Sequence, residues 1–343
     1  MKLLHVKSFL IVALSLLLVL LISAGTTATL SVEVEETLFE LLKEQGEAKP
    51  LHYIENIDPA LAIAGEGIVK KGHAHWPDGS RSRRQSKYFV CTDCHNVEQE
   101  DPVLSNADPE TRLQFAFERG LPFLQGTTFW GMVNREKWYN GDYYKKYGDL
   151  VTNTRDTLVN AIQLCATVCS QGHELGDKEM EAILHYFWSL QLMVGDIGMS
   201  QEDEEKLIQD ELDPEQKRAI IKSYYMTASP ARFVDPVPKS ERQYGVLGNA
   251  SKGKVIYEQG CMHCHDPARN ITNLGLEDAT LSFRLLKKKL SSTSDLSVYE
   301  MIRKGTEPIA GYRPYMPHYT LDRMSDQQIE DLVAYIKQQA KKQ

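Results

Sequence analysis

The chain has few cysteines, a deficit of positive charge and little alternating hydrophobic pattern. Six cysteines in 343 residues are too few for a disulfide scaffold. Asp and Glu total 47 against 39 Lys and Arg, and this formal charge of -8 argues against nucleic acid as a partner, because phosphate binding needs a basic face. The scarcity of apolar–polar alternation predicts few strands. The 42% hydrophobic content and the length favour two packed, mostly α-helical domains.

The amino terminus has the order of regions that is typical of a secretory signal. Lys2 and Lys7 accompany an apolar run from Phe9 to Ile22, and small residues follow up to Ala28. We therefore expect export, to the periplasm or another compartment outside the cytoplasm. Counted to Ala28, the run also approaches the roughly 20 residues that span a bilayer. Residues 1–28 are accordingly expected to be either a signal peptide or a retained anchor in the inner membrane.

Charge-rich stretches and prolines divide the rest of the chain. Residues 29–50 are an acidic lead-in, for which a solvated helix or linker is expected. A first domain is predicted over residues 51–196 and a second over residues 245–343. Residues 197–244 are rich in charge and contain several prolines, which is typical of a linker.

Each predicted domain closes with an amphipathic helix. The apolar positions at i, i+3, i+4 and i+7 are Met180, Ile183, Leu184 and Phe187 in the first domain and Ile329, Leu332, Val333 and Ile336 in the second. Ser325 and Gln328 form a capping box that predicts the start of the second of these helices. The matching pattern indicates a tandem of related helical domains.

Four of the six cysteines lie in two C-x-x-C-H motifs, one near the start of each domain. The motifs read CTDCH and CMHCH and comprise Cys91, Cys94, His95, Cys261, Cys264 and His265. This is the c-type haem attachment pattern, in which two thiols bond one edge of the porphyrin and the next His binds the iron. A zinc site would have to join pairs that lie 170 residues apart, and a thioredoxin-like motif needs a βαβ context. We therefore predict two covalently attached haem c groups, with His95 and His265 as iron ligands.

A methionine loop in the second domain supplies a candidate for the opposite ligand of that haem. Met316 precedes Pro317 and lies 51 residues after His265, and a thioether ligand raises the reduction potential. His318 is the alternative. This domain resembles class I cytochromes c, and the matching residues are Gly253, Tyr257, the Met316 loop, Tyr335 and Ile336.

The first domain has no such loop, but it has two more cysteines before its closing helix. Cys165 and Cys169 are spaced i, i+4 and would lie on one face of a helix. This pattern leaves two interpretations open. The cysteine is either a buried inert thiol or a thiolate ligand to the haem iron, and a thiolate ligand would lower the reduction potential of the haem. Met132 and His173 are weaker ligand candidates.

The chain from about Leu61 resembles the thiosulfate dehydrogenase family of dihaem cytochromes c and the haem subunit of the periplasmic thiosulfate-oxidising (Sox) complex. Their pattern I-x-x-C-x-x-R-x-x-x-G is matched by Ile162, Cys165 and Gly172. The resemblance implies that Cys165, rather than Cys169, is the iron ligand and part of a catalytic site. The basic residue of the pattern, which helps to hold an anionic substrate, is replaced by Val168.

Two functions follow from these observations. The first is electron transfer between redox partner proteins through a Cys-ligated and a Met-ligated haem. The second is an enzyme that oxidises a sulfur oxyanion at the haem ligated by Cys165. An aromatic and basic stretch from Gly126 to Leu150, with Arg135 and Lys137, is a candidate cover for the first haem and for anion binding.

Overall fold

The computed structural model describes residues 36–208, 212–269, 271–272, 274–277, 280–290, 296–306 and 315–341. The expected signal or anchor at residues 1–28 lies outside them. The described residues are mostly helical, and their β pairing consists of three isolated bridges, which confirms the predicted fold class. No helix within the described ranges has the length and hydropathy needed to cross a membrane.

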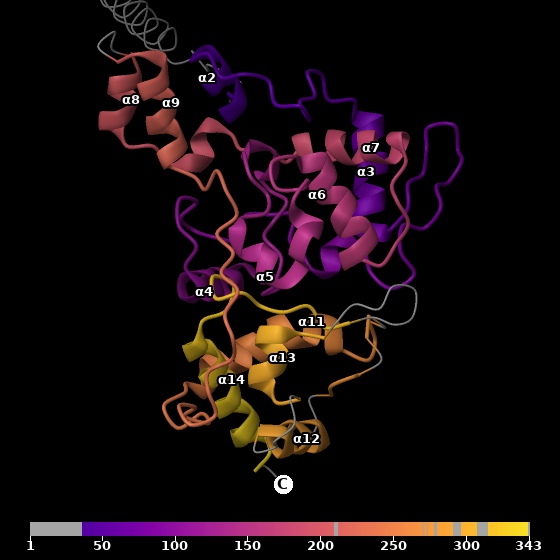
Figure 1. Cartoon of the computed structure of the whole chain (residues 1–343), viewed down its shortest axis with the longest axis vertical. Coiled ribbons are helices and arrows are strands. Elements are labelled where there is room, and N and C mark those ends of the chain that lie inside the picture. Colours follow the sequence, from indigo (N-terminus) through magenta and orange to yellow (C-terminus); the bar gives the residue numbers. More distant parts are fainter. Residues whose placement is uncertain are drawn as a thin grey trace, which may run out of the picture. The chain divides into compact units, whose positions relative to one another are not determined.

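Residues 51–196, the first region, are organised around two helices that pack against each other. The helices of this region are α3 (Pro59–Lys71), α4 (Pro109–Arg119), α5 (Tyr144–Tyr147), α6 (Leu158–Leu164) and α7 (Asp177–Trp188). Helices α3 and α7 lie side by side (Figure 1). Their close approach requires Gly65, because a Cβ atom there would overlap the carbonyl of Ala182. All four predicted core positions of α7 are buried, as expected.

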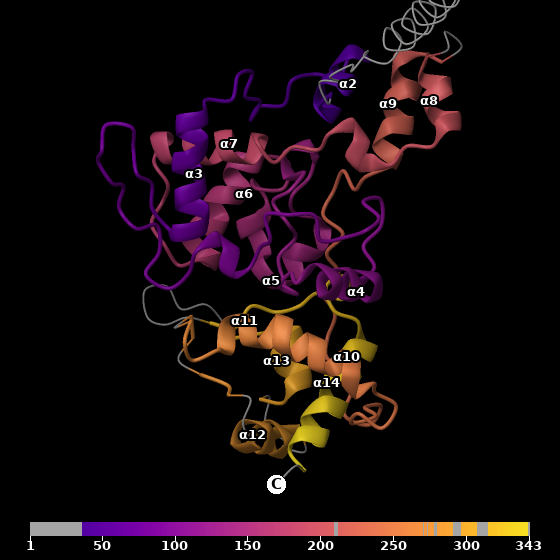
Figure 2. The same cartoon turned by 180° about the vertical axis from the view of Figure 1, so that it is seen from behind.

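Residues 245–343, the second region, repeat this arrangement. Its helical segments are α10 (Ala250–Val255), the π-helical turn Ile256–Cys261, α11 (Met262–His265), α12 (Thr280–Leu290), α13 (Val298–Lys304) and α14 (Asp326–Gln339). Helix α10 packs on α14 (Figure 2), and a Cβ atom on Gly253 would overlap the carbonyl of Asp331. The predicted capping box is confirmed, since the Ser325 amide donates to Gln328 Oε1 (2.9 Å) and the Gln328 amide donates to Ser325 Oγ (3.0 Å).

The lead-in and the linker are partly helical. They contain α2 (Leu38–Glu44), α8 (Gln201–Ile208) and α9 (Pro214–Ser223). Leu38 and Leu42 of α2 are buried in one cluster with Ile221 and Tyr225. The acidic residues of the lead-in concealed this i, i+4 apolar pair, which is enough to dock one turn of helix.

The first and second regions share a hydrophobic core. Phe123 is fully buried in the same cluster as Ile256 and Tyr319. Its amide donates to the carbonyl of Gln259 (3.1 Å), and its carbonyl accepts from the Tyr319 hydroxyl (2.8 Å). The two regions therefore pack against each other through this cluster.

Candidate functional site

A large cavity lies beside the first C-x-x-C-H motif. Its empty volume, including the open mouth, is about 1490 Å³, and its lining is mainly apolar. Cys91, Cys94 and His95 line it, and so do Cys165 and Cys169. The structure therefore brings the first motif and both additional cysteines to one cavity, called here the Cys91 cavity.

His95 is prepared to bind a metal through one ring nitrogen. Its Nδ1 lies 2.6 Å from the carbonyl oxygen of Thr127, and because a carbonyl only accepts, Nδ1 carries the proton and Nε2 keeps a free lone pair. Burial lowers the pKa of His95, which favours the neutral imidazole that binds metals. Phe129 stacks on the ring at 4.5 Å, and a side chain on Gly126 would overlap the imidazole.

The second motif has the same arrangement. Cys261 ends a π-helical turn, and α11 carries Cys264 and His265. His265 Nδ1 lies 2.7 Å from the carbonyl oxygen of Leu274, so its Nε2 is also free to bind a metal. At the first motif, a mainly apolar cavity, paired thiols and a histidine fixed in the metal-binding tautomer fit a covalently bound haem, and His265 is fixed in the same tautomer at the second motif.

The two motifs touch each other although they lie 170 residues apart in the sequence. Cys264 Sγ is 3.8 Å from the carbonyl oxygen of Asp93. His263, inside the second motif, faces the backbone of Thr92 and accepts a hydrogen bond from Arg269 (3.0 Å). The two attachment turns are therefore neighbours in the folded protein.

Cys165 and Cys169 lie on a π-helical turn that continues α6. Such turns are frequent at functional sites. The Cys165 thiol beside it lowers the pKa of Cys169 against the opposing effect of burial, and the hydroxyls of Tyr147 and Tyr315 act in the same direction. The hydrogen bond to Cys169 and burial raise the pKa of Cys165. In this arrangement negative charge is favoured on Cys169, whereas the family resemblance points to Cys165 as the ligand.

The remaining ligand candidates are divided between the cavity and its surroundings. Met132 lines the Cys91 cavity. His173 lies outside it, with Nε2 3.4 Å from a carboxylate oxygen of Glu179. His318, which we expected near the second motif, lines the Cys91 cavity instead, because the chain following Met316 runs along its wall.

Met316 lies on a loop next to the Cys91 cavity. Its amide donates to Thr306 Oγ1 (2.8 Å), and its carbonyl accepts from the Thr306 amide (2.9 Å), which fixes the loop to the end of α13. Its neighbours Tyr315 and Pro317 line the Cys91 cavity. The candidate ligand of the second site therefore belongs to a loop that forms part of the first.

The aromatic and basic stretch that we singled out forms part of the cavity wall. Tyr139, Tyr143 and Tyr147 line the Cys91 cavity together with Arg135. Arg135 Nη1 donates to Thr127 Oγ1 (3.4 Å), whereas Lys137 is exposed and its amide bonds the backbone of residue 227 (3.2 Å). Of the two candidate cations, Arg135 therefore lines the cavity and Lys137 does not.

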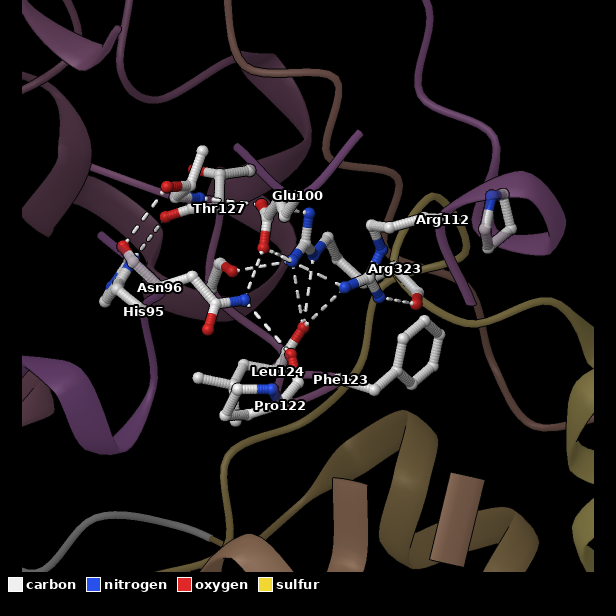
Figure 3. A network of polar contacts seen from close by, with 12 residues as sticks. His95, Asn96, Glu100, Arg112, Pro122, Phe123, Leu124, Thr127 and Arg323 are labelled. Atoms are coloured by element: carbon white, nitrogen blue, oxygen red, sulfur yellow. Dashed lines mark hydrogen bonds and ion pairs between the residues drawn. The ribbon is translucent and has the colours of Figure 1, made fainter. Parts of the chain in front are cut away.

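A buried ion pair beside His95 was not predicted from the sequence. Arg323 of the second region makes two hydrogen bonds to the carboxylate of Glu100 in the first region, at 2.8 and 2.9 Å (Figure 3). Burial would raise the pKa of Glu100, but the charges of Arg323 and Arg112 hold it at about 2. The partners are 223 residues apart, and nothing local in the sequence marks them.

Comparison with known proteins identifies the second region. Residues 250–340, less than half of the chain, match the family model described as Cytochrome c. Searches among curated proteins and among solved structures found no match. The matched segment contains Cys261, Cys264, His265 and Met316. The chain therefore contains a cytochrome c domain, and with it the covalently bound haem c and the electron-transfer chemistry of c-type cytochromes.

Proposed function

We propose that the protein is an exported dihaem cytochrome c that transfers electrons between two redox partner proteins. The contact between the two C-x-x-C-H motifs carries this proposal, together with the matching hydrogen bonds of His95 and His265. Haem iron, when bound, supplies one-electron redox chemistry. One group would be held by the first motif and the other by the second. Adjacent attachment turns keep the path between the two sites short.

Unlike ligands on the two irons support directional transfer. Met316 is the proposed opposite ligand at the second site, where a thioether favours the reduced iron. Cys165 is the proposed ligand at the first site, where a thiolate favours the oxidised iron. Tyr147 and Tyr315 line the Cys91 cavity with both cysteines and lower the pKa of Cys169.

The number of covalent haems tests the dihaem proposal directly. The pyridine haemochrome assay should give two haems per chain for the wild type. It should give one for the double substitution C91S/C94S and one for C261S/C264S, because each pair holds a single group. Cys169→Ser is the matched control and should keep two haems. One haem in the wild type, unchanged in C91S/C94S, would refute a haem at the first motif.

Arg135 supports a second function, the oxidation of a sulfur oxyanion at the Cys91 cavity. In the reaction proposed by resemblance, two thiosulfates join through a new S–S bond and lose two electrons, which pass to an external acceptor. Arg135 is a cation on the cavity wall, and Val168, the departure from the family pattern, lies outside the cavity. The loss of the family's basic residue is therefore offset by a different cation.

Thiosulfate mixing separates the enzyme from the relay. Under the second function, anaerobic addition of thiosulfate to the oxidised holoprotein produces the absorbance bands of reduced haem. Arg135→Gln should slow this at least about tenfold, since a hydrogen bond to a charged group contributes about 1.5–3 kcal/mol. Lys137→Gln, on the exposed neighbour, should have no effect. If dithionite reduces both haems but thiosulfate reduces neither, the protein is a relay only.

A further inference from the structure

The Thr127 carbonyl that accepts from His95 belongs to a short backbone segment, residues 124–127. Arg323 of the second region forms hydrogen bonds with this segment. Arg323 Nη2 donates to the carbonyl of Gly126 (2.8 Å) and to that of Leu124 (3.0 Å). Thr127, whose carbonyl accepts from His95 Nδ1, follows directly. Figure 3 shows His95, Thr127 and Arg323 in this network. A residue of the cytochrome c domain therefore reaches the backbone that orients the histidine of the first motif.

Glu100 holds the other side of the same peptide. Its Oε1 accepts from the amide of Thr128 (2.7 Å), while its two carboxylate oxygens pair with Arg323. Thr127 thus lies between a carbonyl bound by Arg323 and an amide bound by Glu100. The side chains of Arg323 and Glu100 are only 4% and 1% exposed, so water does not compete for these bonds.

Arg112 makes the arrangement rigid. Its Nη1 donates to the carbonyl of Leu124 (3.4 Å), its Nη2 donates to the carbonyl of Arg323, and its guanidinium lies 3.9 Å from the ring centre of Phe123. The planar guanidinium of Arg323 donates to a carboxylate and to two carbonyls at the same time. A lysine cannot reproduce this, because an ammonium group has no such planar set of donors.

We propose that Arg323 is a positioning residue for His95, and that the cytochrome c domain thereby tunes the iron site of the first motif. The proposal rests on the proposed function in one respect, that the first motif binds haem. The strength of the hydrogen bond at Nδ1 sets how strongly the imidazole donates electrons through Nε2. A well-placed Thr127 carbonyl therefore favours the oxidised iron, and its displacement favours the reduced iron.

The test compares two buried Arg–Glu pairs. Arg323→Lys keeps the charge but loses the planar guanidinium, so the first haem should be reduced more easily, with a threefold to tenfold larger equilibrium constant; tenfold is 59 mV for one electron. Arg242→Lys is the matched control. Arg242, in the linker stretch, pairs with Glu300 of the second region at 2.6 Å, and both side chains are buried. Arg242→Lys should leave the reduction potential of the first haem unchanged.

Spectroelectrochemistry gives the reduction potentials of both haems, and electron paramagnetic resonance reports the axial ligand field of each ferric haem.

The outcomes distinguish positioning from general damage. An unchanged first-haem potential and spectrum in Arg323→Lys, with two haems bound, overturns the positioning role and leaves the proposed function intact. Equal shifts of both haems overturn it too. A wild type with one haem would instead contradict the proposed function. If Arg323→Lys does not fold, Glu100→Gln serves, because it removes the charge of the partner and should also raise the first-haem potential alone.

Discussion

Gly65→Val is expected to prevent α3 from packing on α7 and to abolish haem attachment at the first motif. The new side chain would meet the carbonyl of Ala182, a backbone atom that cannot rotate away. Overpacking a core costs about 1–3 kcal/mol when side chains can adjust, so a loss of about 3 kcal/mol or more in the free energy of unfolding is expected. Thermal unfolding and the haem count measure the effect.

The control for this substitution is another glycine of the same region. Gly141→Val introduces the same side chain where a Cβ atom has no neighbour within 4 Å, and it should unfold like the wild type. Gly253→Val should damage the second region in the way that Gly65→Val damages the first, because Asp331 takes the place of Ala182. A wild-type melting temperature for Gly65→Val would contradict the observed helix crossing.

Cys165→Met is expected to raise the potential of the first haem on the order of 0.1 V or more, while both haems stay attached. A thioether donates less than a thiolate and favours the reduced iron, and changes of axial ligand span about 0.8 V among haem proteins. Cys169→Met should shift the potential less, because it replaces a neighbour of the ligand. Potentiometric titration and the absorption of the ferric haem measure the change.

The paired substitutions also decide between the two sulfur atoms. The hydrogen bonds from Tyr147 and Tyr315 favour charge on Cys169, so a larger rise in Cys169→Met would reassign the ligand to that residue. Unchanged potentials in both variants would remove thiolate ligation altogether. Met132 and His318 would then be the remaining candidates on the cavity wall.

The parts of the fold that depend on local pattern were predictable from the sequence. The core face of α7, the capping box at Ser325 and the helical class all follow from residue spacing, and the structure confirms them. The two motifs could be recognised for the same reason. Their mutual contact could not, since it depends on how the two regions pack and leaves no periodicity in either.

The composite nature of the first site was equally hidden. Tyr315, His318 and Arg323 line the Cys91 cavity, yet they follow the second motif in the chain. His318 was expected as an alternative ligand in the second domain, to which it belongs in the chain. Because Phe123 packs into the core of the second region, residues that are distant in the chain lie close together in the fold.

The contact between Cys264 and the carbonyl of Asp93 has a consequence for biogenesis. Covalent attachment requires each cysteine pair to be accessible to the machinery that joins thiols to haem. Once the two turns lie against each other, each restricts access to the other. With haem at both motifs, as proposed, we expect attachment to come before the two regions dock. Maturation and folding of the protein would then follow one order.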